Sequence, residues 1–177
     1  MEIEADPPVE ILPWTFNVLV APEETALSLL RSMLDPRRFL FLYVCGNYSR
    51  LLSRINLRNA EFDVRRAFTS SQLLSIVDEA HHTFVFIEHD ESLYAESEEM
   101  AGYLSLALRE LSRESTVVLY SPAFDETLQA ISNKADRVLC LERMAYARSA
   151  RPHPRRTRRD RMPHGLPPGE QRRLEAF

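Results

Sequence analysis

The sequence predicts an α/β domain of three layers (αβα), in which helices cover both faces of a mainly parallel, five-stranded sheet. Short runs of branched and aromatic apolar residues, such as 83–87 (TFVFI), have the composition of strands that are covered on both faces. These runs alternate with longer segments whose apolar residues recur at helical spacing. Strands and helices that alternate in this way indicate a parallel sheet with right-handed crossovers. Residues 61–66 add a sixth strand if they pair at an edge of the sheet.

Each helix is predicted from its stripe of apolar residues and from the residues at its ends. Pro22 suits the first turn of the first helix, where Glu23 and Glu24 complement the helix dipole. Thr69 and Gln72 have the spacing of a capping box, and Ser97 and Asp125 are the expected N-caps of two later helices. The expected strands are 16–21, 39–44, 83–87, 115–120 and 137–141, and the expected helices lie at 22–35, 51–55, 69–80, 97–111 and 125–133.

Charge divides the 177-residue chain into two parts. Residues 1–142 carry 12 basic and 23 acidic side chains, whereas residues 143–177 carry ten arginines against three acids. We therefore expect a globular domain at 1–142, with an N-terminal arm at 1–15, followed by a disordered basic tail rich in arginine and proline. The start of the chain does not resemble a signal peptide, and no apolar run reaches the roughly 18 residues that span a bilayer, so we expect a cytoplasmic protein without a membrane partner. Cys45 and Cys140 are expected to be reduced thiols in the core.

Four segments of the chain resemble the RecA/KaiC-type ATPase domain, a family with the phosphate-loop NTPase fold. FLFLYVCGN (39–47) is similar to the second strand of that family, TFVFIEHDESLYAE (83–96) to the third, and STVVLYSP (115–122) to the fourth. ISNKADRVLCLE (131–142) is similar to its closing segment. The resemblance covers about Phe16 to Glu142 and implies a RecA-like sheet. It also implies a site formed by Asn47, Glu88, Asp90 and Ser121, where the family has its water-activating, magnesium-side and sensor residues.

Two departures from the family argue against conventional ATP hydrolysis. The turn at 20–25 (VAPEET) stands where the phosphate loop is expected, but it has no glycine, no lysine and two carboxylates. A phosphate there would be repelled, and proline removes a backbone donor. Asn47 stands where the family has a carboxylate, and an amide does not accept a proton near neutral pH. The sequence therefore favours a protein that is not an enzyme and predicts no cofactor; ATP with Mg²⁺ is the disfavoured alternative.

Charge indicates two further candidate sites, one for a metal ion and one for nucleic acid. Glu88 and Asp90 follow a buried strand, where carboxylates can hold a magnesium ion, but one or two carboxylates without a phosphate bind it weakly. The tail has the charge that attracts nucleic acid through its phosphates, although residues 147–176 have no aromatic side chain to stack on bases. The arginines concerned are Arg151, Arg155, Arg156, Arg158, Arg159 and Arg161.

The N-terminal arm carries the chain's only tryptophan, Trp14, in the apolar segment 9–16 (VEILPWTF). We prefer the interpretation that Trp14 covers one edge of the core, since large aromatic side chains are usually well buried. The alternative is that the arm contacts another protein.

Together these patterns favour a non-catalytic, RecA-like protein that acts by binding, as a regulatory or assembly partner of an active RecA-type ATPase or of DNA-handling machinery. Its partner would be such a relative or a second copy of the chain. The alternatives are an unorthodox ATPase that uses Glu88, Asp90 and a metal, and nucleic-acid binding through the tail.

Overall fold

The computed structural model describes residues 10–34, 40–55, 62–95, 97 and 99–141, all within the first of two units, which spans Met1–Met144. The proposed tail and its six arginines lie outside the described residues, as do residues 1–9 of the arm. The strands are β1 (Phe16–Val20), β2 (Phe41–Cys45), β3 (Phe62–Arg66), β4 (Phe84–Glu88), β5 (Thr116–Ser121) and β6 (Arg137–Cys140). The helices are α1 (Glu23–Met33), α2 (Ser70–Asp78), α3 (Glu99–Leu111) and α4 (Glu126–Ser132), with two 3-10 helices, η1 (Leu52–Arg54) and η2 (Glu91–Tyr94).

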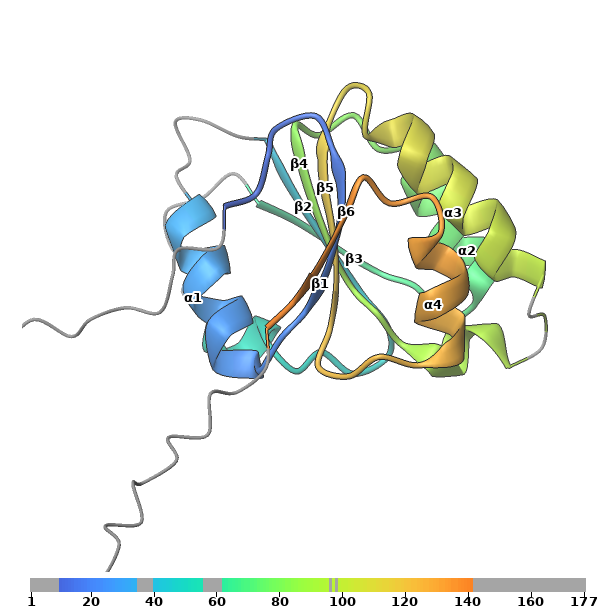
Figure 1. The fold of residues 1–177 in the computed structure, drawn as a ribbon, viewed down its shortest axis with the longest axis horizontal. Helices are drawn as coiled ribbons and strands as arrows, with labels where there is room; N and C mark the ends of the chain where they lie inside the picture. Colours follow the sequence, from blue (N-terminus) through green and yellow to red (C-terminus); the bar gives the residue numbers. More distant parts are fainter. Residues whose placement is uncertain (1–9, 35–39, 56–61, 96, 98, 142–177) are drawn as a thin grey trace, which may run out of the picture. The chain divides into compact units, whose positions relative to one another are not determined.

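The six strands form one sheet in the order β3-β2-β4-β5-β1-β6, and every neighbouring pair is parallel. The expected three-layer α/β fold with a parallel sheet is therefore confirmed, and β3 is the sixth strand at one edge. Figure 1 shows α1 on one face of the sheet and α2, α3 and α4 on the other.

Two hydrophobic cores lie between these layers because successive side chains of a strand point to opposite faces. On the α1 face, Phe86 of β4 lies between Tyr43 and Tyr120, with ring centroids 5.5 and 5.9 Å apart. On the other face, Val85 and Ile87 of the same strand pack in the core formed with α2, α3 and α4. β4 is buried along its whole length, so the segment at its carboxyl end is fixed by packing on both sides.

The chain leaves the strands toward different faces of the sheet. The segment after β2 contributes Leu51 and Ile55 to the core of the α1 face, and α1 itself follows β1. In contrast, α3 follows β4 and α4 follows β5, and both pack on the opposite face. The connections therefore diverge between β1 and β5 and between β2 and β4, which are the positions where open α/β sheets form clefts at their carboxyl edge.

Two expectations about single side chains are wrong. Trp14 does not cover the core, since 57% of its surface is exposed; Ile11, which is 9% exposed, takes that place in the core of the α1 face. Cys140 is exposed because it lies on the edge strand β6, whereas Cys45 is buried as expected. Neither cysteine forms a disulfide.

The expected caps of α2 and α4 are present. The Thr69 hydroxyl accepts a hydrogen bond from the Gln72 amide at 3.2 Å, and the Gln72 side chain accepts one from the Phe68 amide at 2.8 Å. Asp125 accepts a hydrogen bond from the Leu128 amide at 2.7 Å.

Replacement of Thr69 by alanine should lower the free energy of unfolding by about 1 kcal/mol, because it leaves a first-turn amide of α2 without its acceptor. For a chain of this size that corresponds to a fall in Tm of about 2–4 °C, measurable by thermal denaturation. Ser71→Ala is the matched control, since Ser71 is an exposed residue in the first turn of the same helix. Equal effects of the two substitutions would contradict the capping role of Thr69.

Candidate functional site at the carboxyl edge of the sheet

Glu88 is the most elaborately bonded side chain at the carboxyl edge of the sheet. It is the last residue of β4 and only 5% exposed, yet it carries a carboxylate. Its Oε1 accepts hydrogen bonds from the Tyr43 hydroxyl, from Ser49 Oγ at 2.6 Å and from the Leu51 amide at 3.1 Å. Its Oε2 accepts one from the Arg50 amide at 2.9 Å. A buried carboxylate needs such partners, and here they all come from β2 and the loop that follows it.

The hydrogen bonds of Glu88 have two consequences. They hold residues 49–51 against the end of β4, and they occupy both carboxylate oxygens with donors from the protein itself. A metal ion at Glu88 would compete with these donors for the carboxylate oxygens, and any donor that it displaced would be left without a partner in a buried place. The buried carboxylate is therefore placed to organise the loop after β2.

Burial at this edge also raises the pKa values of two tyrosines, Tyr43 and Tyr120. Burial, together with the Glu88 carboxylate, raises the pKa of Tyr43 far above its usual range. Burial, with smaller contributions from Glu23 and Glu88, raises the pKa of Tyr120 to about 12. Both hydroxyls therefore stay protonated near neutral pH, and neither is a base there.

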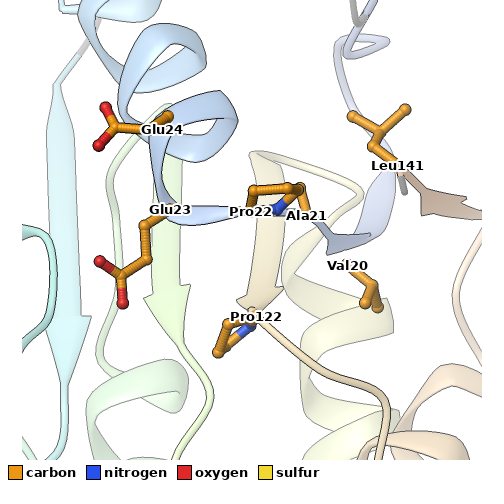
Figure 2. A pocket seen from close by; sticks show the side chains of 7 residues that line it. All are labelled: Val20, Ala21, Pro22, Glu23, Glu24, Pro122 and Leu141. Carbon is orange, nitrogen blue, oxygen red and sulfur yellow. The ribbon is translucent and has the colours of Figure 1, made fainter. Parts of the chain in front are cut away.

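The turn between β1 and α1 borders a pocket of about 550 Å³. Its lining is apolar except for two carboxylates, and Figure 2 shows these on the side opposite Val20 and Leu141. The lining residues are Val20, Ala21, Pro22, Glu23, Glu24, Pro122 and Leu141. This is the turn where the sequence resemblance would place a phosphate loop.

The carboxylates of this turn are paired with arginines from the segment after β2. Glu23 lies 3.7 Å from both Arg50 and Arg54, and Glu24 accepts a hydrogen bond from Arg54 at 2.7 Å. Exposed pairs of this kind stabilise a fold by less than about 1 kcal/mol each. The two carboxylates matter more for ligand binding. Glu23 and Glu24 already complement the positive end of α1, and they would repel a phosphate there.

The other predicted site residues each form local contacts of their own. Asn47 is exposed, and its backbone carbonyl oxygen accepts a hydrogen bond from Arg66 at 2.7 Å. Asp90 caps η2 by accepting hydrogen bonds from the Ser92 amide and hydroxyl at 3.1 and 2.6 Å. Ser121 donates to the Ala123 carbonyl at 2.6 Å, as a turn residue does. Asn47, Glu88, Asp90 and Ser121 share one edge of the sheet, but none of them lines the pocket beside the turn between β1 and α1.

Asp90 also packs tightly against the end of β2. A Cβ atom added to Gly46 would lie 2.2 Å from Asp90 Oδ2, so only glycine fits there without displacing the carboxylate. This contact joins the loop after β2 to the loop after β4.

A second buried pair at this edge was missed in the sequence. His89 Nε2 lies 2.9 Å from Asp125 Oδ2, and the histidine side chain is 2% exposed. His89 Nδ1 and the hydroxyl of the neighbouring Tyr94 are buried and have no hydrogen-bond partner among the described residues. The sequence identified Asp125 as a helix cap but offered no periodicity that links it to a residue 36 positions away.

Among the described residues, no group of three or more His, Cys, Asp or Glu side chains is arranged to hold a metal ion. Within the same residues, no helix is long and apolar enough to cross a membrane.

Comparison with known proteins finds a relative of this chain. No protein-family model matches the chain. A protein of Archaeoglobus fulgidus, described as uncharacterized, is 36% identical over 129 residues, which is 72% of this chain. The match covers 65% of that protein's own length. This similarity assigns no activity.

Replacement of Glu88 by glutamine should lower the free energy of unfolding by about 1–3 kcal/mol, measured by urea denaturation. A glutamine oxygen can still accept the three hydrogen bonds made to Oε1, but its amino group would face the Arg50 amide, so that two donors oppose each other. Glu91→Gln is the control, because Glu91 is exposed in the first turn of η2 and should change stability by no more than about 0.5 kcal/mol. If Glu88→Gln were as stable as the control, Glu88 would not be the buried acceptor described here.

Proposed function

We propose that this protein is a non-catalytic member of the RecA/KaiC-type fold that acts by binding a protein partner, either an active relative or a second copy of the chain. The observation that carries the proposal is that the charged groups at the carboxyl edge of the sheet are engaged in hydrogen bonds and ion pairs with other residues of the same chain. Glu88 is bonded to the loop after β2, and the turn between β1 and α1 carries two arginine-paired carboxylates.

The order of the strands supports the relation to that fold. The segments that resemble the second, third and fourth strands of the family are β2, β4 and β5, and they lie side by side in this order. β1, which leads into the turn at the phosphate-loop position, lies next to β5, and the closing segment adds β6 beyond it.

The same geometry argues against an unorthodox ATPase that uses Glu88, Asp90 and a metal. Both carboxylates of that hypothesis accept hydrogen bonds from nearby protein groups. A transition state for phosphoryl transfer needs donors and cations that are already aimed at the developing charge. The turn at 20–25 supplies carboxylates instead.

Titration of the full chain with ATP and Mg²⁺ in a calorimeter tests the catalytic part of the proposal. We expect no saturable heat below about 1 mM nucleotide, which corresponds to less than about 4 kcal/mol of binding free energy. We also expect no saturable heat from the double variant Glu23→Gln/Glu24→Gln, because removal of the two negative charges supplies neither the glycines nor the lysine of a phosphate loop. Micromolar binding with turnover that is lost in Glu88→Gln would show that the protein is an enzyme.

Trp14 is a candidate for the contact with a partner, because its side chain is 57% exposed. Its backbone has a φ of 59°, a left-handed conformation that is unfavourable for a bulky residue. The Trp14 amide donates to the Thr116 hydroxyl at 3.2 Å, and the Thr15 hydroxyl donates to the Leu12 carbonyl at 2.6 Å. These bonds fix a strained turn that presents an exposed indole, so neither burial nor backbone preference accounts for a tryptophan there.

Replacement of Trp14 by glycine should leave the melting transition unchanged or raise it, because glycine adopts this φ without strain. The same variant should lose self-association, measured by sedimentation at increasing protein concentration. Phe124→Ala, which removes another exposed aromatic side chain, is the control and should behave as the unaltered chain does. A monomeric unaltered protein whose Trp14→Gly variant is markedly less stable would make Trp14 a structural residue.

A further inference from the structure

The loop after β2 presents the most exposed large hydrophobic side chain of the described residues, Tyr48, at 85% exposure. The residues on either side of it are held in place. The Asn47 carbonyl accepts the hydrogen bond of Arg66, and Ser49 and the Arg50 amide are bonded to Glu88. An aromatic ring is thus exposed on a loop whose backbone is fixed by a buried carboxylate.

A second exposed aromatic residue lies in the adjoining loop. Phe68 follows β3 and is 59% exposed. The loops after β2 and β3 run together, since the Ala67 amide donates to the Cys45 carbonyl at 3.0 Å and Arg66 reaches Asn47. Among the described residues from 41 to 68, the other exposed large hydrophobic side chain is Val64, and it is less exposed, at 38%. The exposed apolar surface here is therefore mainly aromatic.

Arginines are frequent in the two loops that carry these rings. Among the described residues 47–55 and 62–68 there are four arginines and one acid. Of the acids near these arginines, Asp63 is bonded to His82, Glu79 pairs with Arg65, and Glu23 and Glu24 pair with Arg50 and Arg54.

Of the four described arginines, Arg50 and Arg66 are the best placed for an anionic ligand. Arg66 forms its hydrogen bond with a neutral carbonyl, and Arg50 lies 3.7 Å from Glu23, with 64% of its side chain exposed. Two further carboxylates of the described residues lie nearby: Glu88 is bonded to the Arg50 amide, and Asp90 lies against Gly46 and accepts from Ser92.

We infer that Tyr48, Phe68, Arg50 and Arg66 form a binding surface for single-stranded nucleic acid, which we call the β2–β3 loop surface. Aromatic rings stack on the faces of unpaired bases, and arginines neutralise the phosphates between them. A loop that is already fixed loses little conformational freedom on binding. This surface is distinct from the arginine tail and goes beyond the proposed function: it can fail while the ATP titration still supports a non-catalytic protein.

Fluorescence anisotropy of the full chain with a labelled oligothymidylate of about 16 nucleotides tests this inference. Tyr48→Ala and Phe68→Ala should each weaken binding by about 5- to 150-fold, the range expected for the loss of one base stack. Tyr103→Ala is the matched control, because Tyr103 is also 59% exposed but lies on α3, and it should leave the affinity unchanged. Circular dichroism should show that the three variants keep the same melting temperature within about 2 °C.

The salt dependence separates this surface from the tail. Arg66→Gln should reduce the slope of log Kobs against log salt concentration by about 0.7, whereas Tyr48→Ala should leave the slope unchanged. A full chain in which the six tail arginines at 151–161 are replaced by glutamine should bind less tightly but still respond to Tyr48→Ala. The inference is wrong if no oligonucleotide binds, or if binding is unaffected by Tyr48→Ala and is lost with the tail arginines. Loss of self-association in Tyr48→Ala, without oligonucleotide binding, would instead make the surface a protein interface.

Discussion

The buried carboxylate of Glu88 is the interaction on which the carboxyl edge of this sheet depends. A charged group in a nearly dry environment is tolerated only when donors satisfy it, and here the Tyr43 and Ser49 hydroxyls and the amides of Arg50 and Leu51 do so. The direction of β4, packed on both faces, fixes where the carboxylate lies. The carboxylate in turn fixes the loop after β2, and with it the position of Arg50 beside Glu23.

The same arrangement bears on both the proposed absence of catalysis and the proposed binding surface. A strand-end carboxylate that held a metal would need oxygens that face a ligand, whereas the oxygens of Glu88 face the protein. The loop that it holds can therefore be rigid and still expose Tyr48, which is useful for recognition. In the same way, the ion pairs of Glu23 and Glu24 close the turn between β1 and α1 to phosphates while they join that turn to the segment after β2.

Hydrophobic periodicity predicted the fold because burial of each strand on both faces leaves a continuous apolar run in the sequence. The runs at 83–87 and 115–120 correspond closely to β4 and β5, and local spacing also predicted the Thr69 and Asp125 caps. The sequence placed Asn47, Glu88, Asp90 and Ser121 at strand ends, which the structure bears out. The partners of Glu88 could not be predicted, since Ser49 is 39 residues away along the chain. The same holds for the pair of His89 and Asp125, which are 36 residues apart. Trp14 was misjudged because composition gives a residue's average burial and not the φ of its turn.

Amide hydrogen exchange at Arg50 and Leu51 is the most direct test of the role of Glu88. If the carboxylate accepts both amides, each should exchange at least about tenfold more slowly than an unbonded surface amide, and addition of Mg²⁺ should leave both rates unchanged. In Glu88→Gln, the Arg50 amide should lose its protection more than the Leu51 amide, because the glutamine oxygen can still accept the latter. Rapid exchange at both positions would contradict the account, and exchange that Mg²⁺ accelerates would indicate that Glu88 binds the metal instead of the amides.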